Sequence, residues 1–231
     1  MLTGTEIAII TLSLKVAAVA MAAALPIAFV VAYALARWRF AGRGLLQALV
    51  TLPLVLPPVV TGYALLVWFG ANGTLGAFLR DWFGLEFAFR WTGAALAAGV
   101  MAFPLLVRPI RLSLEAIDPG LEEAAETLGA SRLRILATVT IPLAFPGLLA
   151  GAILGFAKAL GEFGATITFV SNIPGETRTL SLAIYSLLQS PEGDSAALRL
   201  IAFSVVLAIA AVVVSEWVAT RLPAAGGRRH D

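Results

Sequence analysis

Residues 44–79 read GLLQALVTLPLVLPPVVTGYALLVWFGANGTLGAFL, and this run of 36 residues contains no charged side chain. A second run, residues 135–157, is equally free of charge. A helix needs about 20 apolar residues to cross the hydrocarbon core of a bilayer, and each run is long enough to do so. These two stretches therefore predict membrane-spanning helices.

The composition extends this prediction to the whole chain of 231 residues. Hydrophobic residues make up 60% of it and charged residues only 13%, whereas soluble domains contain about 45–50% and about 25%. Lipid must therefore replace water around much of the surface. The chain has no cysteine and one histidine, His230, which excludes disulfides, metal sites built on these residues and histidine-based catalytic triads. The net charge of +2 gives no reason to expect a nucleic-acid partner.

Five stretches are long and apolar enough to cross a membrane, and they lie at about residues 7–36, 45–69, 91–112, 138–160 and 197–220. We expect an all-α polytopic membrane protein that forms a single domain over residues 1–231. A sixth crossing through residues 164–189 is the alternative, because both halves of that segment are apolar. Polar residues at 172–178 interrupt it, so a re-entrant or surface-lying segment is preferred there.

The positions of the arginines predict the orientation of these spans. Ten arginines fall on one side of them, namely Arg37, Arg39, Arg43, Arg108, Arg111, Arg132, Arg134, Arg221, Arg228 and Arg229. The segments on the other side carry a mixed and mostly acidic set of charges. Cytoplasmic segments are enriched in arginine and lysine, so we expect the amino terminus outside and the carboxyl terminus in the cytoplasm.

The cytoplasmic loop at residues 113–137 carries the signals of a structured segment. Asp118 is a typical N-cap, and Pro119 suits the first position of a helix. Glu122 and Glu123 then lie in the first turn, where the helix dipole favours acidic side chains. The sequence therefore predicts a short helix that begins at this Asp-Pro pair.

One face of this short helix is small and apolar, because apolar side chains recur at spacings of three and four residues. These side chains are Leu121, Ala124, Ala125 and Leu128. Gly129 is a typical left-handed helix stop, and Ser131 can cap a second short helix. On helix chemistry alone, an amphipathic hairpin that merely lies on lipid headgroups is an equal alternative to a docking element.

The residues that follow have a distinctive spacing. Glu123-Ala124-Ala125 is followed after three intervening residues by Gly129 and, after nine more intervening residues, by Val139-Thr140-Ile141-Pro142. This spacing resembles the EAA motif of importer-type ABC transporter permeases, with Val139 and Ile141 in place of the usual Ile and Leu. The resemblance implies that the loop forms coupling helices that dock into a groove on a separate ATPase subunit. The residues implied in this coupling are Leu121, Glu122, Glu123, Ala124, Ala125, Leu128, Gly129, Ala130, Ser131 and Arg132.

The chemistry of these residues is consistent with docking. The alanines and Gly129 would permit the close approach of a partner surface, while Glu122, Glu123 and Arg132 would supply charged contacts at its rim. The chain contains no Gly-x4-Gly-Lys-Ser/Thr phosphate loop. We therefore expect no catalytic residue and no cofactor in this chain, with ATP and Mg²⁺ held by the partner ATPase.

Ionisable residues at the outer end of the fourth span are candidates for a transport pathway. An i,i+4 pair between Lys158 and Glu162 at the interface is an equally weighted alternative. The run Gly161-Glu162-Phe163-Gly164-Ala165 also resembles a region of molybdate and sulfate permeases that contributes to the outer gate and the pathway. The candidates here are Lys158, Gly161, Glu162 and Gly164.

Three prolines in the middle of the second span predict a bend, because proline frees carbonyl groups of the preceding turn. Bent or broken helices often mark transport sites, although a purely structural kink is the alternative. The Leu-Pro-Pro sequence at residues 56–58 resembles the same group of permeases, so Pro57 and Pro58 are further candidates for the pathway.

Over nearly its full length the chain resembles the permease subunits of molybdate ABC importers, which implies a type I ABC importer permease fold in the inner membrane of a prokaryote. The resemblance implies a homodimer of this subunit, two ATPase subunits and an extracytoplasmic oxyanion-binding protein. The expected function is translocation of molybdate or tungstate by alternating access.

Two other functions are weighed against this one. Transport of sulfate or another oxyanion is the nearer alternative, and no residue in the sequence decides against it. An ion-coupled secondary carrier is less favoured, because it would need coupling carboxylates near the bilayer midplane. The acidic residues within the spans are Glu162 and Glu216, both near span ends, and no internal repeat is present.

Overall fold

The computed structural model describes residues 2–191 and 193–221, and every regular element within them is helical. The Arg228-Arg229 tail and His230 lie outside the described residues. In chain order the elements are α1 Gly4–Arg37, α2 Arg43–Val55, α3 Pro58–Phe69, α4 Thr74–Phe83, α5 Trp91–Glu115, α6 Pro119–Thr127, α7 Arg132–Ile135, the π-helical turn η1 Leu136–Thr140, α8 Ile141–Leu160, α9 Gly164–Val170, α10 Leu180–Leu188 and α11 Asp194–Arg221.

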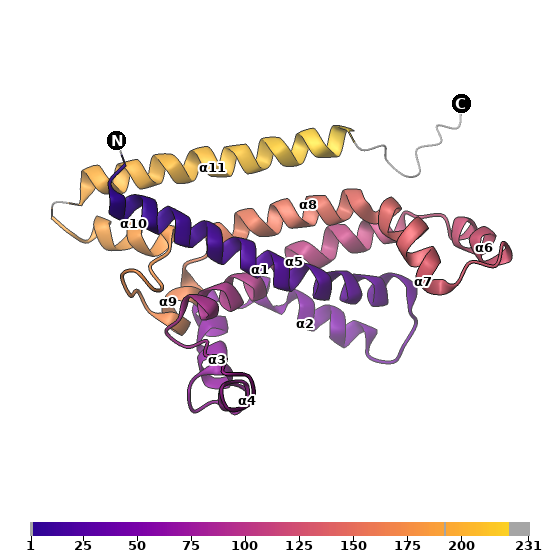
Figure 1. Cartoon of the computed structure of the whole chain (residues 1–231), viewed down its shortest axis with the longest axis horizontal. Helices are drawn as coiled ribbons and strands as arrows, with labels where there is room; N and C mark the ends of the chain where they lie inside the picture. Colours follow the sequence, from indigo (N-terminus) through magenta and orange to yellow (C-terminus); the bar gives the residue numbers. More distant parts are fainter. Residues whose placement is uncertain (1, 192, 222–231) are drawn as a thin grey trace.

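The core is formed where α1, α5 and α8 pack against one another (Figure 1). Small side chains line this contact because membrane helices associate through close packing of their backbones. On α1, Ala17, Ala20, Ala24 and Ala28 follow one another at helical spacing and are buried. Larger side chains of α5, such as Leu106 and Ile110, fill the remaining space and are fully buried.

Four described helices are long and apolar enough to cross a membrane: Gly4–Arg37, Trp91–Glu115, Arg132–Leu160 and Asp194–Val214. They coincide with four of the five predicted spans. The two short helices α9 and α10, of 7 and 9 residues, are each too short to span the bilayer. The segment 164–189 thus has the broken form expected of a re-entrant or surface-lying stretch.

The predicted span at residues 45–69 is not one helix. It is divided into α2 and α3, which meet at an angle of 115°. Leu56 and Pro57 adopt extended backbone conformations between them, since a residue that precedes a proline is disfavoured in the helical region. Leu56 precedes Pro57, which itself precedes Pro58, so the helix breaks here instead of kinking, and only the pair together could form a fifth span.

The loop between α5 and α8 forms at one end of the molecule. Asp118 caps α6 by accepting a hydrogen bond from the amide of Gly120 (2.9 Å), and Gly129 adopts a left-handed conformation (φ +81°) after the helix ends. Ser131 caps α7, but α7 is not a separate helix. Because residues 132–140 contain no glycine or proline, α7 continues through η1 into α8 as one helix of 29 residues.

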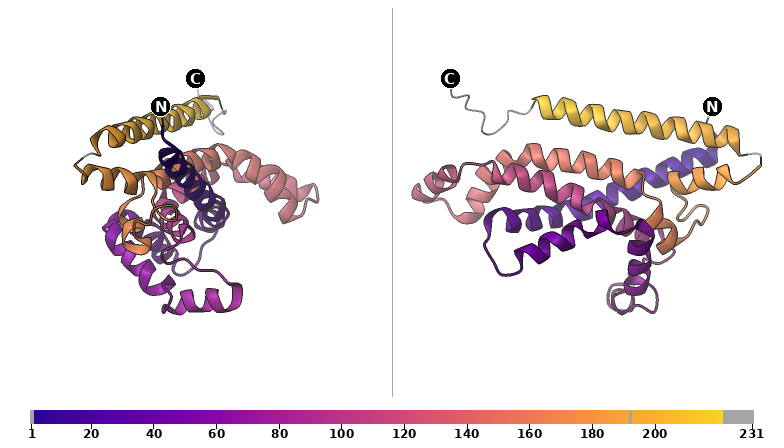
Figure 2. Two further views of the ribbon diagram at one scale, coloured as in Figure 1. Left: turned by 60° about the vertical axis from the view of Figure 1, so that its left-hand side comes forward. Right: turned by 180° about the vertical axis from the view of Figure 1, so that it is seen from behind.

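The two ends of the molecule differ in composition. α6, α7 and the turn between α1 and α2 lie at one end, which we call the α6 end (Figures 1 and 2). The start of α1, together with α9, α10 and the start of α11, lies at the opposite end, which we call the α10 end. The predicted basic segments around residues 37–43 and 132–134 therefore gather at the α6 end.

Candidate functional site

The first candidate site is the projecting tip formed by residues 119–134, which we call the α6 tip (Figure 2). Its leucines point away from the helical core: Leu128 is 89% exposed and Leu133 is 79% exposed. Burying large apolar side chains is favourable, so covering these leucines with another protein or with lipid headgroups would be stabilising. All ten residues predicted for coupling lie within the tip.

The exposure of these residues separates them into two groups. Glu123, Ala124, Gly129, Ser131 and Arg132 are exposed, together with Leu121 and Leu128. Ala125, Ala130 and Glu122 are only partly exposed. The exposed face thus combines two leucines with small residues and opposite charges, a composition suited to the close approach of another protein.

Glu122 makes contacts within the chain that the sequence did not predict. Its Oε1 atom lies 3.2 Å from Nη2 of Arg37 at the end of α1, and it accepts a hydrogen bond of 2.8 Å from the hydroxyl of Thr140. Thr140 is the last residue of η1 and is 1% exposed. Glu122 therefore anchors the α6 tip to α1 and η1, and its rim contact with a partner stays a prediction.

The second candidate site lies where α8 ends and α9 begins. Nζ of Lys158 is 2.6 Å from Oε2 of Glu162, so the weighed i,i+4 pair is present. The other carboxylate oxygen of Glu162 accepts a hydrogen bond of 3.0 Å from the amide of Ala165 at the start of α9. Glu162 is only 3% exposed, and a buried carboxylate needs such partners to remain charged.

The structure brings the proline and glycine candidates together, although the sequence places them more than a hundred residues apart. α3 packs against α9, and a Cβ atom at Gly164 would lie 2.7 Å from Cβ of Pro58. A Cβ atom at Gly62 would lie 2.5 Å from the carbonyl oxygen of Ala165. The contact requires glycine at both positions, because no side chain fits between the two helices. We call this contact the α3/α9 junction.

The remaining two candidates flank the α3/α9 junction without entering it. Pro57 is the N-cap of α3, and its carbonyl oxygen accepts from the amide of Val60 (2.9 Å). Gly161 ends α8, and a Cβ atom there would meet nothing closer than 3.8 Å. Pro57 therefore shapes the start of α3, whereas Gly161 shapes the end of α8, the helix that precedes α9.

Sequence reasoning missed Thr61 on α3. Its side chain is 7% exposed, and its hydroxyl has no hydrogen-bond partner within the described chain. It lines a cavity of about 220 Å³ inside the bend between α2 and α3, together with Leu56 and Pro53. A single threonine in an apolar run gives no sequence signal, so only the fold reveals this unpaired hydroxyl.

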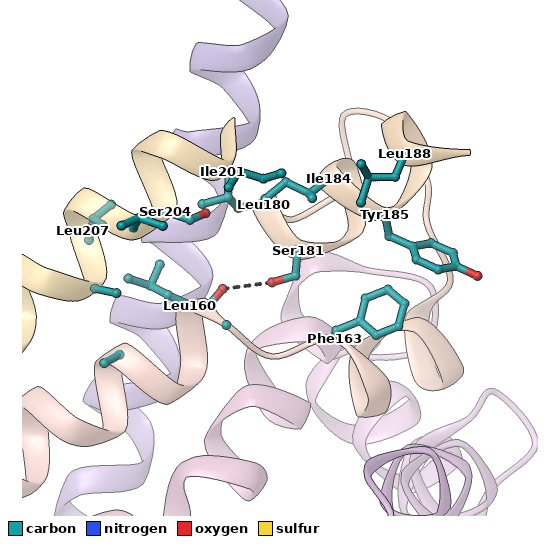
Figure 3. Close-up of a pocket in the computed structure, with 14 residues that line it drawn as sticks. Leu160, Phe163, Leu180, Ser181, Ile184, Tyr185, Leu188, Ile201, Ser204 and Leu207 are labelled. Carbon is teal, nitrogen blue, oxygen red and sulfur yellow. Dashed lines mark hydrogen bonds between the residues drawn. The ribbon is translucent and has the colours of Figure 1, made fainter. Parts of the chain in front are cut away.

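A larger cavity lies beside the second site, between α8, α10 and α11 (Figure 3). It measures about 510 Å³, and Ser181 at its edge donates a hydrogen bond of 3.4 Å to the carbonyl oxygen of Leu160. The rings of Phe163 and Tyr185 meet at one side, with centroids 4.9 Å apart. No charged side chain lines this cavity, so it suits an apolar group and not an anion. Among the described residues, no three potential metal ligands cluster together.

Comparisons with known proteins agree on one family. The model for binding-protein-dependent transport system inner membrane components matches residues 9–223. The molybdenum transport system permease protein ModB of Haemophilus influenzae is 55% identical over 94% of this chain and 95% of its own length. A putative molybdenum transport permease of Bacillus subtilis is 41% identical over 78% of this chain and 80% of its own length.

More distant proteins resemble the chain in sequence or fold. The sulfate transport system permease protein CysT of Salmonella typhimurium is 44% identical over 77% of this chain and 62% of its own length. A bacterial ABC transporter that imports the polysaccharide alginate has the same fold, with a TM-score of 0.71 at 17% identity, covering 96% of this chain and 81% of its own. Taken with the helical fold and its projecting tip, these matches show that the chain belongs to the family of binding-protein-dependent transport system inner membrane components.

Proposed function

We propose that this chain is the permease subunit of an ATP-driven importer that translocates molybdate, and also tungstate, by alternating access. The observation that carries the proposal is the α6 tip, whose exposed leucines and small residues stand at one end of a helix that runs unbroken from Arg132 to Leu160. The names of the relatives with 55% and 41% identity support molybdate as the substrate.

The assembly that fits this role contains a second copy of the permease, two ATPase subunits and an extracytoplasmic oxyanion-binding protein. Two observations support the binding protein as a partner. The family name refers to binding-protein-dependent transport, and an alginate ABC transporter has been solved in complex with a periplasmic protein. The gathering of basic segments at the α6 end supports a cytoplasmic location for that end, with the amino terminus outside. A second copy is consistent with the general prevalence of two-fold symmetric homo-oligomers among proteins.

Movement would pass from the ATPase to the pathway along one mechanical connection. ATP-driven approach of the two ATPase subunits would draw the two α6 tips together. The α7–η1–α8 helix would carry this displacement to Glu162, and the hydrogen bond from Ala165 would pass it to α9 and the α3/α9 junction. The pathway would then open outward, and hydrolysis would reset it. ATP and Mg²⁺ would be bound by the partner, so the permease performs no covalent step.

Sulfate transport is a second candidate, because the sulfate permease of Salmonella typhimurium shares 44% identity with this chain over 177 residues. Both substrates are doubly charged tetrahedral oxyanions. Selection between them would reside largely in the binding protein that delivers the anion, since the pathway must release what it receives.

Reconstitution tests the proposal directly. The permease and its co-expressed ATPase are placed in proteoliposomes, and uptake of radiolabelled molybdate, tungstate and sulfate is measured with and without binding protein and ATP. We expect uptake of molybdate and tungstate that requires both additions. Uptake that needs no ATPase would refute the ABC importer assignment, and uptake of sulfate alone would favour the second candidate.

A further inference from the structure

Two arginines lie within the membrane-spanning helix α5, in the third of it nearest the α6 end. Arg108 and Arg111 precede the last residue, Glu115, by seven and four positions. A helix rises 1.5 Å per residue, so Arg108 lies about 10 Å along the axis from that end.

The two arginines differ in how their charge is balanced. Nε of Arg111 lies 2.8 Å from Oε1 of Glu115, and its Nη1 donates to the side-chain oxygen of Gln47 on α2. Arg43 approaches the same Glu115 carboxylate at 3.9 Å. Arg108 is exposed, and no hydrogen bond or ion pair links it to any other described residue. Arg108 and Arg111 therefore stand against the single carboxylate of Glu115, which leaves one positive charge in excess.

Arg108 borders a cavity of about 320 Å³ between α2 and α5. Gln47 and Thr51 form its polar wall on α2, and their side chains are joined by a hydrogen bond of 3.2 Å. Arg108, Arg111 and Glu115 form the opposite wall. The cavities of about 510 and 620 Å³ have no charged side chain in their linings, and the cavity of about 370 Å³ is lined by one, Arg178. The cavity beside Arg108 differs from these because two arginines and one glutamate line it, which leaves one positive charge in excess.

We propose that this cavity binds a tetrahedral oxyanion with low affinity, with Arg108 as its principal ligand and Arg111 held in place beside it. The excess positive charge of the cavity favours an anion, and a guanidinium group pairs with oxyanions in a forked geometry. The proposal rests on the proposed function, in which an imported oxyanion leaves the pathway at the α6 end. The phosphate of an inner-leaflet phospholipid has the same chemistry.

The exposure of Arg108 fits a site through which an anion passes. A solvated guanidinium binds more weakly than a buried one, and conduction requires sites that release what they bind. The site therefore differs from a deep basic trap, which would hold the anion in the membrane.

Binding is tested on the permease–ATPase complex in nanodiscs of phosphatidylcholine, without binding protein or ATP. Equilibrium binding of radiolabelled molybdate is measured for the wild type, Arg108→Gln, Arg108→Lys and the control Arg39→Gln. Arg39 is exposed near the same end of the molecule and does not line the cavity. We expect Arg108→Gln to weaken binding by at least about tenfold, Arg108→Lys by less, and the control to be unchanged.

A second arm distinguishes the source of the oxyanion. Nanodiscs that also contain radiolabelled phosphatidylglycerol are dissolved in detergent, and the lipid retained by the complex is counted. Retention that is lost in Arg108→Gln, with no molybdate binding in phosphatidylcholine, would assign the site to a lipid phosphate. The inference is overturned if the substitution changes neither measurement, or if it dissociates the permease pair, which would make Arg108 an ion-pair partner of the second copy.

These outcomes are separable from those of the uptake experiment. Molybdate binding that depends on Arg108 in a complex that imports no molybdate would overturn the proposed function alone. Molybdate uptake by the wild type, with no effect of Arg108→Gln on either arm, would overturn this inference alone.

Discussion

At the scale of single residues, one carboxylate joins three elements that are far apart in the sequence. Glu122 of α6 contacts Arg37 of α1 and Thr140 of η1 through the same oxygen atom. A π-helical turn inside an α-helix is frequently found at functional sites. Glu122 therefore fixes the direction of the α6 tip relative to the helical core, which is the property that force transmission requires.

Glu122→Gln should weaken this anchor, because an amide keeps the shape but loses the charge that attracts Arg37. Hydrogen bonds to charged groups contribute about 1.5–3 kcal/mol, so we expect a lower melting temperature and more ATP hydrolysed per molybdate imported. Glu126→Gln is the matched control, since Glu126 is exposed on the same helix. An unchanged ratio of ATP to molybdate in Glu122→Gln would contradict the anchoring role.

Lys158→Met should destabilise the protein by about 3 kcal/mol, because it leaves the buried Glu162 carboxylate without its cation. Adding Glu162→Gln should recover most of this loss, since the double variant no longer buries an unpaired charge. Thermal unfolding of the purified permease, followed by tryptophan fluorescence, measures both effects. A double variant no more stable than Lys158→Met would show that the pair is not the source of the stability.

At the scale of elements, the α6 tip and the α3/α9 junction depend on glycines for different reasons. Gly129 ends α6 in a left-handed conformation, which other residues adopt at a cost of about 1–2 kcal/mol. Gly62 permits two backbones to touch. The first glycine determines the shape of a surface, and the second determines the distance between two helices.

Glu123→Gln and Gly129→Ala should each leave membrane insertion intact while uncoupling ATP hydrolysis from uptake, because both alter the exposed face of the tip and not the spans. Gly84→Ala is the control for the backbone effect, since Gly84 also has a positive φ (+65°) with open space around it. Coupled uptake at the wild-type rate in both tip variants would show that the α6 tip does not couple ATP hydrolysis to transport.

Gly62→Ala should separate α3 from α9, because its Cβ would lie 2.5 Å from a backbone oxygen that cannot move independently. Overpacking of this kind costs about 1–3 kcal/mol. We expect reduced molybdate uptake with normal assembly of the complex, and no change in Gly44→Ala, where a Cβ atom meets nothing within 4 Å. Wild-type uptake by Gly62→Ala would show that the junction is not part of the gate.

At the scale of the whole molecule, the two candidate sites occupy opposite ends and are joined by the unbroken α7–η1–α8 helix (Figure 1). The packed core of α1, α5 and α8 gives that helix a rigid support. In contrast, α2, α3 and α11 expose many large apolar side chains, which lipid or a second copy must cover in the membrane.

The sequence by itself determined the features that depend on neighbours along the chain. Hydropathy located the long helices, the Asp118-Pro119 cap and Gly129 set the limits of α6, and the prolines indicated a bend in the second span. Each of these features follows from interactions within a few residues, such as capping or the loss of an amide proton. The spacing of the motif at residues 123–142 is also a property of the chain alone, so the resemblance to ABC transporter permeases could be recognised from the sequence.

Only the tertiary structure decided which distant residues meet. Arg37 and Glu122 are separated by 85 residues, and Pro58 and Gly164 by more than a hundred, so helical periodicity carries no information about either contact. The 115° angle between α2 and α3 likewise depends on what α3 packs against. The sequence suggested a rim contact between Glu122 and a partner, but it could not show that this carboxylate also pairs with Arg37, because that side chain is contributed by another helix.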